Sequence, residues 1–172
     1  LIKLYKACKD DVSKFIKELE SYEDRNLRAK ALYLYYTQKG KCMYTGESID
    51  LSFILNKKDS FASLYDIDHI YPRSITKDDS LDNLVLVKKN INIELSDTYP
   101  LDISIQNKMF SFWKELKEQG FISSNKFYRL IRKDALTIEE LAGFINRQLV
   151  ETSQAAKTTA DILKKLYPST EI

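Results

Sequence analysis

Two stretches decide the predicted fold: Tyr65-Asp-Ile-Asp-His-Ile-Tyr-Pro-Arg-Ser74 and Leu84-Val-Leu-Val87. In the first, polar and apolar side chains alternate from Tyr65 to Ile70, which is typical of a half-buried strand. Pro72 ends any regular strand pairing there. The second stretch is apolar and β-branched, and it predicts a second strand. We therefore expect two short strands at the centre of the chain.

The first strand carries the groups that could perform chemistry. His69 is the only histidine of the sequence, and Asp66 and Asp68 precede it. Side chains alternate along a strand, so the two aspartates share one face and His69 points to the other. Asp68 and His69 can act on one substrate only if the strand twists or ends, and Pro72 favours an end. The alternative is two solvated carboxylates beside an edge-strand histidine.

Two asparagines follow His69 in the sequence, and their spacing from it indicates a particular kind of site. Asn83 precedes the second strand, and Asn92 lies in the segment 88–97, for which we predict a helix. Asp-His, Asn and Asn thus fall on a strand, a loop and a helix start, which is the arrangement of a ββα-metal nuclease site. A carboxylate and an amide oxygen suit Mg²⁺, which retains several waters. A neutral imidazole can take a proton from the attacking water.

The flanking sequence is predicted to be helical. Apolar residues recur every three or four positions in the helices expected before the strands and after residue 103. Gly40 and Gly120 are predicted to end helices, Ser123 or Ser124 to cap one, and Thr137 with Glu140 to form a capping box. The remaining expectations are a helix at Leu4–Leu19, a break at Ser21–Asn26, a helix at Leu27–Gln38, a strand entering a turn at Cys42–Gly46, a short helical piece at Leu51–Leu55 and a more polar helical stretch to Leu166.

Composition limits the function classes. The 172 residues suit one domain, and 27 Lys+Arg against 25 Asp+Glu give a net charge of +2. A free-standing nucleic-acid binder usually has a larger basic excess, so a nuclease of this charge needs either a local basic patch or a larger partner to hold its substrate. Two cysteines exclude a disulfide framework. The longest near-apolar run, Ala31–Tyr36, is too short to span a membrane, and no secretory segment opens the chain, so we expect a cytoplasmic protein. The chain begins with Leu1, which suggests a fragment.

The segments Tyr65–Ser74 and Lys77-Asp-Asp-Ser-Leu-Asp-Asn-Leu-Val-Leu86 closely resemble the HNH nuclease domain of type II CRISPR RNA-guided DNA endonucleases. Further similarity extends from about Leu27 to Leu163. It includes Leu32–Tyr36 and Lys41–Gly46 at the entry to that domain, Ser96-Asp97 with Pro100 and Lys126-Phe127 in its body, and Gly143–Thr152 in the linker that returns to a RuvC-like nuclease.

The resemblance implies roles for individual residues. Asp68 matches the metal-binding aspartate, His69 the general base and Asn92 the asparagine that completes the metal site. Asn83 matches an asparagine that usually stabilises the loop, and Asp66 an acidic position of open role. The implied cofactor is Mg²⁺, for which Mn²⁺ can substitute.

The resemblance also implies a fold, a substrate and partners. The fold would be α+β and mostly helical, with a ββα-metal (HNH, His-Me finger) core whose two-stranded antiparallel hairpin is surrounded by helices. The substrate would be the target DNA strand in an RNA–DNA heteroduplex. Guide RNA and the RuvC-like and recognition modules of a bacterial parent chain would be the partners. The implied domains are a linker helix at 1–30, the HNH domain at 31–134 and returning linker helices at 135–172.

One departure concerns phosphate contacts. Leu95 occupies a position where related sequences often have a lysine before the Ser-Asp pair. Arg73, Lys88 and Lys89 remain candidates for phosphate contact, but each is equally explained as a solvated charge.

Two other functions remain open from the sequence. A stand-alone HNH endonuclease of the restriction or homing type would use the same residues, but the long flanking helices and the return linker argue against it. A helical DNA- or protein-binding module with a silent site is the other alternative, and the intact Asp68, His69 and Asn92 argue against it.

Overall fold

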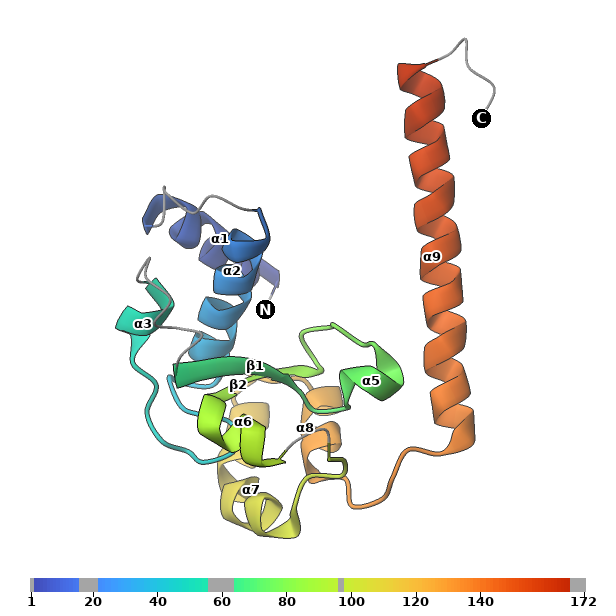
Figure 1. Ribbon diagram of the computed structural model, residues 1–172. Coiled ribbons are helices and arrows are strands. Elements are labelled where there is room, and N and C mark those ends of the chain that lie inside the picture. Colours follow the sequence, from blue (N-terminus) through green and yellow to red (C-terminus); the bar gives the residue numbers. More distant parts are fainter. Residues whose placement is uncertain (1, 16–21, 56–63, 96–97, 168–172) are drawn as a thin grey trace.

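The computed structural model describes residues 2–15, 22–55, 64–95 and 98–167. A two-stranded antiparallel sheet lies at the centre, with helices on several sides (Figure 1). The predicted class, α+β and mostly helical, is confirmed. The elements are α1 (Ile2–Phe15), α2 (Tyr22–Thr37), α3 (Leu51–Leu55), β1 (Tyr65–His69), α5 (Arg73–Thr76), β2 (Leu84–Lys88), α6 (Lys89–Leu95), α7 (Ile103–Glu118), α8 (Ser124–Ile131) and α9 (Ile138–Leu166).

The two strands and α6 form one unit. Tyr65 pairs with Lys88 at one end of the sheet, and His69 pairs with Leu84 at the other. Residues 84–87 of β2 are buried, as their apolar side chains require. α6 begins at the residue after β2 and packs against both strands (Figure 1). This strand–strand–helix unit places Asp66, Asp68, His69 and Asn92 in one region of the molecule.

The free edge of β2 is completed by a side chain. Gln38 lies directly after α2, is fully buried, and donates its Nε2 to the carbonyl of Leu86 at 2.8 Å. Its Oε1 accepts from the Leu86 N–H, also at 2.8 Å. The Leu86 carbonyl accepts a second bond from the Met43 N–H at 3.1 Å. The amide of Gln38 thereby does for β2 what a third strand would do, and it fixes α2 against the sheet.

Two local predictions are wrong. α2 begins at Tyr22, so the expected break is absent over residues 22–26. Residues 42–46 form a turn and not a strand, because the N–H of Gly46 bonds back to the carbonyl of Cys42 and only an isolated bridge joins Lys41 to Ser48. Gly40 is left-handed after α2 as predicted, with φ 68°, and Lys39 before it is also left-handed, with φ 53°. The predictions for residues 16–21 and for Ser96-Asp97 lie outside the described residues.

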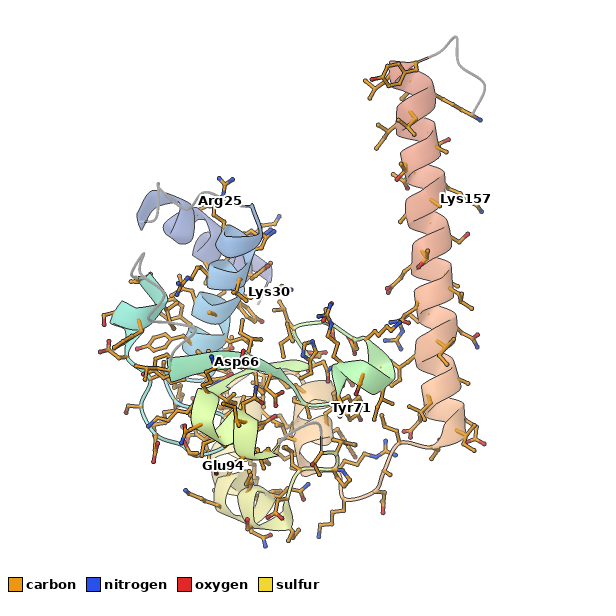
Figure 2. The ribbon with its side chains drawn as sticks, in the orientation of Figure 1. Arg25, Lys30, Asp66, Tyr71, Glu94 and Lys157 are labelled. Atoms are coloured by element: carbon orange, nitrogen blue, oxygen red, sulfur yellow. The ribbon has the colours of Figure 1, made fainter. Side chains whose placement is uncertain are left out.

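The C-terminal half forms as predicted, except that the last two helical stretches are one helix. Ser123 caps α8, and Thr137 with Glu140 forms a capping box on the 29-residue α9. α9 touches the body near its base, where the ring centroids of Phe144 and Tyr71 lie 5.9 Å apart. Its farther part, which carries Lys157, stands away from the other helices (Figures 1 and 2). Within the described ranges, no helix has both the length and the apolar character that a membrane span requires.

Candidate active site

Asp68 is held by a tyrosine from the turn beside the sheet. The Tyr44 hydroxyl donates to Asp68 Oδ2 at 2.6 Å, and Tyr44 is 1% exposed. Burial raises the pKa of the Asp68 carboxyl, although the hydrogen bond from Tyr44 and the neighbouring His69 act in the opposite direction. Burial and the adjacent Asp68 raise the pKa of Tyr44 well above its usual value. The hydrogen bond from Tyr44 thus fixes the partly buried Asp68 carboxylate in one orientation. The same bond offsets part of the free-energy cost of removing this carboxylate from water.

His69 is the last residue of β1, and its ring meets a different loop. His69 Nε2 lies 2.8 Å from Asp79 Oδ1. Asp79 belongs to the segment between α5 and β2. The end of the strand predicted near Pro72 occurs here, because β1 stops at His69 and α5 begins at Arg73.

Asn92 bonds to the residue whose role was open. Its Nδ2 donates to Asp66 Oδ2 at 2.8 Å, and both side chains are half-buried. Figure 2 shows Asp66 on β1 with α6, which carries Glu94, beside it. Because the Nδ2 group is directed at Asp66, the amide oxygen of Asn92 is the atom that remains for another ligand.

Asn83 is fully buried and joins the two ends of the loop between the strands. Its Oδ1 accepts from the Tyr71 N–H at 2.8 Å, and its Nδ2 donates to the carbonyls of Tyr71 and Asp78 at 3.0 and 2.9 Å. Three hydrogen bonds from one buried amide hold the segment that follows His69 next to the segment that carries Asp79.

The same loop is anchored to α8 by a half-buried ion pair. Arg129 Nη1 lies 2.8 Å from Asp78 Oδ2. Burial opposes ionisation, but hydrogen bonds from Ser80 and Arg129 lower the pKa of Asp78. The Arg129 guanidinium also lies over the ring of Tyr71, 4.7 Å from its centroid. The residue that precedes Asp79 is therefore fixed to the body of the protein.

The three basic residues named as phosphate-contact candidates lie in two places: Arg73 is beside Asp79, whereas Lys88 and Lys89 are at the end of β2 that is farther from His69. Arg73 is exposed, and its Nε is 3.4 Å from Asp79 Oδ1. Lys88 forms an ion pair with Glu47, which raises the pKa of the lysine. Lys89 begins α6. Arg73 and Lys88 thus have acidic partners in the structure.

Sequence reasoning missed Tyr44 and Asp79, which contact two of the three principal site residues. The burial of Tyr44 is what packing alone would require of an aromatic side chain. It lies 24 positions from Asp68, and no local pattern pairs them. Asp79 lies in a run of acidic loop residues, in which nothing local distinguishes the one that turns toward His69.

The donor set fits a hard cation of few protein ligands. Asp68 and Asn92 supply a carboxylate and an amide oxygen, which are the ligand types of Mg²⁺. Within residues 2–15, 22–55, 64–95 and 98–167, no cluster of three or more His, Cys, Asp or Glu side chains could enclose a metal ion. Such an enclosure is unnecessary for Mg²⁺, which usually keeps several waters and binds through one or two carboxylates.

Comparison with known families agrees with this geometry. Residues 42–101, which include both strands and α6, match the model of the HNH endonuclease family. The chain therefore contains an HNH endonuclease domain, and this domain is of the type found in type II CRISPR enzymes.

The assignment to the type II CRISPR kind of HNH domain rests on relatives that are CRISPR-associated endonucleases Cas9. The Listeria innocua protein is 40% identical over 166 residues, which are 95% of this chain and 12% of that relative. The Streptococcus mutans protein is 39% identical over 163 residues, or 94% of this chain and 11% of the relative. The chain thus spans about an eighth of the length of these relatives.

A solved structure shares the fold. Streptococcus thermophilus Cas9 in complex with the GGAA PAM aligns with a TM-score of 0.60 and 22% identity, over 97% of this chain and 17% of that one. The architecture described above is therefore similar to that of one segment of this solved structure.

Proposed function

We propose that this domain hydrolyses a phosphodiester of the DNA strand that is paired with guide RNA, as the HNH module of a longer, RNA-guided bacterial endonuclease. The observation that carries the proposal is the placement of Asp68, His69 and Asn92 on one strand–strand–helix unit, each with a neighbour that fixes its side chain. The names of the relatives and the solved complex with a PAM support the same class of substrate.

The roles follow from the chemistry of the side chains. A ring nitrogen of His69 takes a proton from the water that attacks the phosphorus. Asp68 and the amide oxygen of Asn92 would hold Mg²⁺, for which Mn²⁺ can substitute. When bound, the cation neutralises charge on the phosphate and on the leaving oxygen. Tyr44 orients Asp68, and Asp66 orients Asn92 so that its oxygen faces the cation.

The net charge of +2 supports delivery of the substrate by a larger chain. Neutralisation of phosphates supplies most of the affinity of a free nucleic-acid binder, and this domain has little excess charge for it. In the proposed arrangement, the recognition modules of the parent hold the heteroduplex and the HNH domain acts on the strand presented to it. Residues 1–30 and 135–172 connect the domain at 31–134 to a RuvC-like module, and the parent works in the bacterial cytoplasm.

The test is His69→Ala in the full-length, guide-loaded enzyme. Cleavage of the guide-paired strand is expected to fall by about 10²–10⁴-fold, which is the range for loss of a general base. Cleavage of the other strand serves as an internal control for folding and guide loading, and it should be unchanged. Undiminished cutting of the guide-paired strand would remove His69 from the mechanism. Cleavage of duplex DNA by the 172-residue chain without any guide would instead favour a stand-alone endonuclease.

A further inference from the structure

Among the residues that the structure describes, the ring of His69 has a carboxylate as its hydrogen-bond partner. His69 Nε2 and Asp79 Oδ1 are 2.8 Å apart, and the His69 side chain is 18% exposed. An ionised carboxylate can only accept a hydrogen bond. In the neutral imidazole, Nε2 must therefore be the nitrogen that carries the proton, which leaves the lone pair on Nδ1.

Asp79 itself is fixed in place. The preceding residue, Asp78, is held by Arg129 through its side chain and by Asn83 through its carbonyl. Arg73 lies on the other side of Asp79, with Nη2 3.5 Å from Oδ2 and Nε 3.4 Å from Oδ1. The carboxylate therefore has a defined position even though half of its surface is exposed.

This contact adds little to the stability of the fold. Ion pairs and hydrogen bonds that involve a half-exposed carboxylate contribute little to folding. A contact to the only histidine of the chain, from a residue whose preceding neighbour is anchored to α8, is therefore better explained by what it does to the imidazole. Variants of Asp79 are expected to fold for the same reason.

We propose that Asp79 is a positioning residue that selects the Nε2–H tautomer of His69 and fixes the ring, so that Nδ1 is the atom that accepts the proton of the attacking water. In that step the O–H bond of the water breaks, its proton joins Nδ1, and the electron pair of the oxygen forms the new P–O bond. The P–O bond to the leaving oxygen breaks, and Nε2–H remains bonded to Asp79. The inference rests on the function proposed above.

The first experiment compares Asp79→Asn with Asp79→Ala in the full-length, guide-loaded enzyme. Asn keeps the size of the side chain, but its amide can donate to Nε2 and so favour the opposite tautomer. Asp79→Ala should slow cleavage of the guide-paired strand by about 10–100-fold, as loss of an orienting partner does. Asp79→Asn should be slower still, in the range of about 10²–10⁴-fold, with KM little changed.

The order of the two variants distinguishes positioning from a structural role. If Asp79 only supports the loop or supplies charge, the nearly isosteric Asn will be the milder change and Ala the more severe one. That order, or full activity in both variants, would overturn the proposal. Glu94→Gln is the matched control, because it removes one exposed negative charge from neighbouring α6, and it should leave the rate within about twofold.

The second experiment reads the tautomer directly and does not depend on cleavage. His69 is the only histidine of the 172-residue chain, so its two ring nitrogens give the only imidazole signals in a long-range ¹H–¹⁵N correlation spectrum. Above the usual titration range of histidine, wild type should show a protonated Nε2 and an unprotonated Nδ1. Asp79→Asn should shift the population toward Nδ1–H. A spectrum of wild type with Nδ1–H would refute the proposal.

The two experiments separate this inference from the proposed function. If His69→Ala keeps its activity, the general-base role is wrong whatever the spectrum shows. If His69→Ala is inactive while both Asp79 variants cut normally, the proposed function stands and the role of Asp79 is wrong.

Discussion

Alanine at position 83 and alanine at position 92 should affect different properties of the domain. Asn83→Ala should lower the stability, whereas Asn92→Ala should abolish cleavage with little change in stability. Asn83 makes three side-chain hydrogen bonds and is fully buried. At about 1 kcal/mol for each bond, Asn83→Ala should lower the free energy of unfolding by about 3 kcal/mol, because water cannot replace the lost partners. For a domain of this size, that loss corresponds to a fall in Tm of about 6–12 °C.

Asn92→Ala should leave the stability almost unchanged. Among the described residues, the side chain of Asn92 makes one hydrogen bond, to the half-buried Asp66, worth about 0.5–1.5 kcal/mol. Alanine recovers about 0.5–0.7 kcal/mol of that through its better helix propensity. Cleavage of the guide-paired strand should nevertheless be lost, since the amide oxygen of Asn92 is a proposed metal ligand.

The assay is urea unfolding followed by the fluorescence of Trp113, the only tryptophan of the chain, which is fully buried and donates to the Met43 carbonyl. The measurements are made with a chelator, so that metal binding does not contribute. If Asn92→Ala loses more stability than Asn83→Ala, the two asparagines have exchanged roles and the assignment of the metal site is wrong.

Three further outcomes follow. Tyr44→Phe should lower the free energy of unfolding by about 1.5–3 kcal/mol at neutral pH, because it removes the hydrogen bond to Asp68. The pKa of Asp68 is raised, so this loss of stability should be small in acid and should grow as pH rises through that pKa. A loss of stability that is independent of pH would contradict a hydrogen bond to an ionised carboxylate. Burial lowers the pKa of Lys126 to about 7, so the unfolded chain binds more protons than the folded chain between about pH 7 and 10. The free energy of unfolding of wild type should rise over that window by up to about 1.4 kcal/mol per pH unit. Lys126→Met should lack this rise, and an equal dependence of the unfolding free energy on pH in the two proteins would refute the lowered pKa of Lys126. The isolated chain should bind duplex DNA weakly, with an affinity that falls as salt increases; tight binding at physiological salt, measured by fluorescence anisotropy, would contradict delivery by a parent chain.

Local chemistry was sufficient to predict the elements that carry the site. Alternation in Tyr65–Ile70, the apolar run at residues 84–87 and the capping residues Ser123 and Thr137 each act within a few positions, and the structure has strands and caps there. Propensity failed at residues 22–26, where the polar sequence gave no helical signal but the chain continues α2, which packs against α1.

The contacts that fix the site could not be predicted in the same way. Gln38 bonds to Leu86 across 48 positions, and Tyr44 bonds to Asp68 across 24. Such pairs depend on how α2 and the following turn pack against the sheet, which no periodicity within one segment contains. The family resemblance named Asp68, His69 and Asn92, but it did not name the residues that orient Asp68 and His69.

α9 has a mechanical consequence that follows from its length. At 1.5 Å per residue, its 29 residues extend about 43 Å. The contacts that set its direction lie near one end, where Phe144 meets Tyr71 and Gln148 reaches the carbonyls of Thr76 and Lys77. A pivot of about 10° at these contacts would carry Leu166, about 30 Å away, through about 5 Å, since an intact helix bends little over such a distance. A small rotation of α9 where it contacts the loop beside the site would therefore produce a much larger displacement at Leu166.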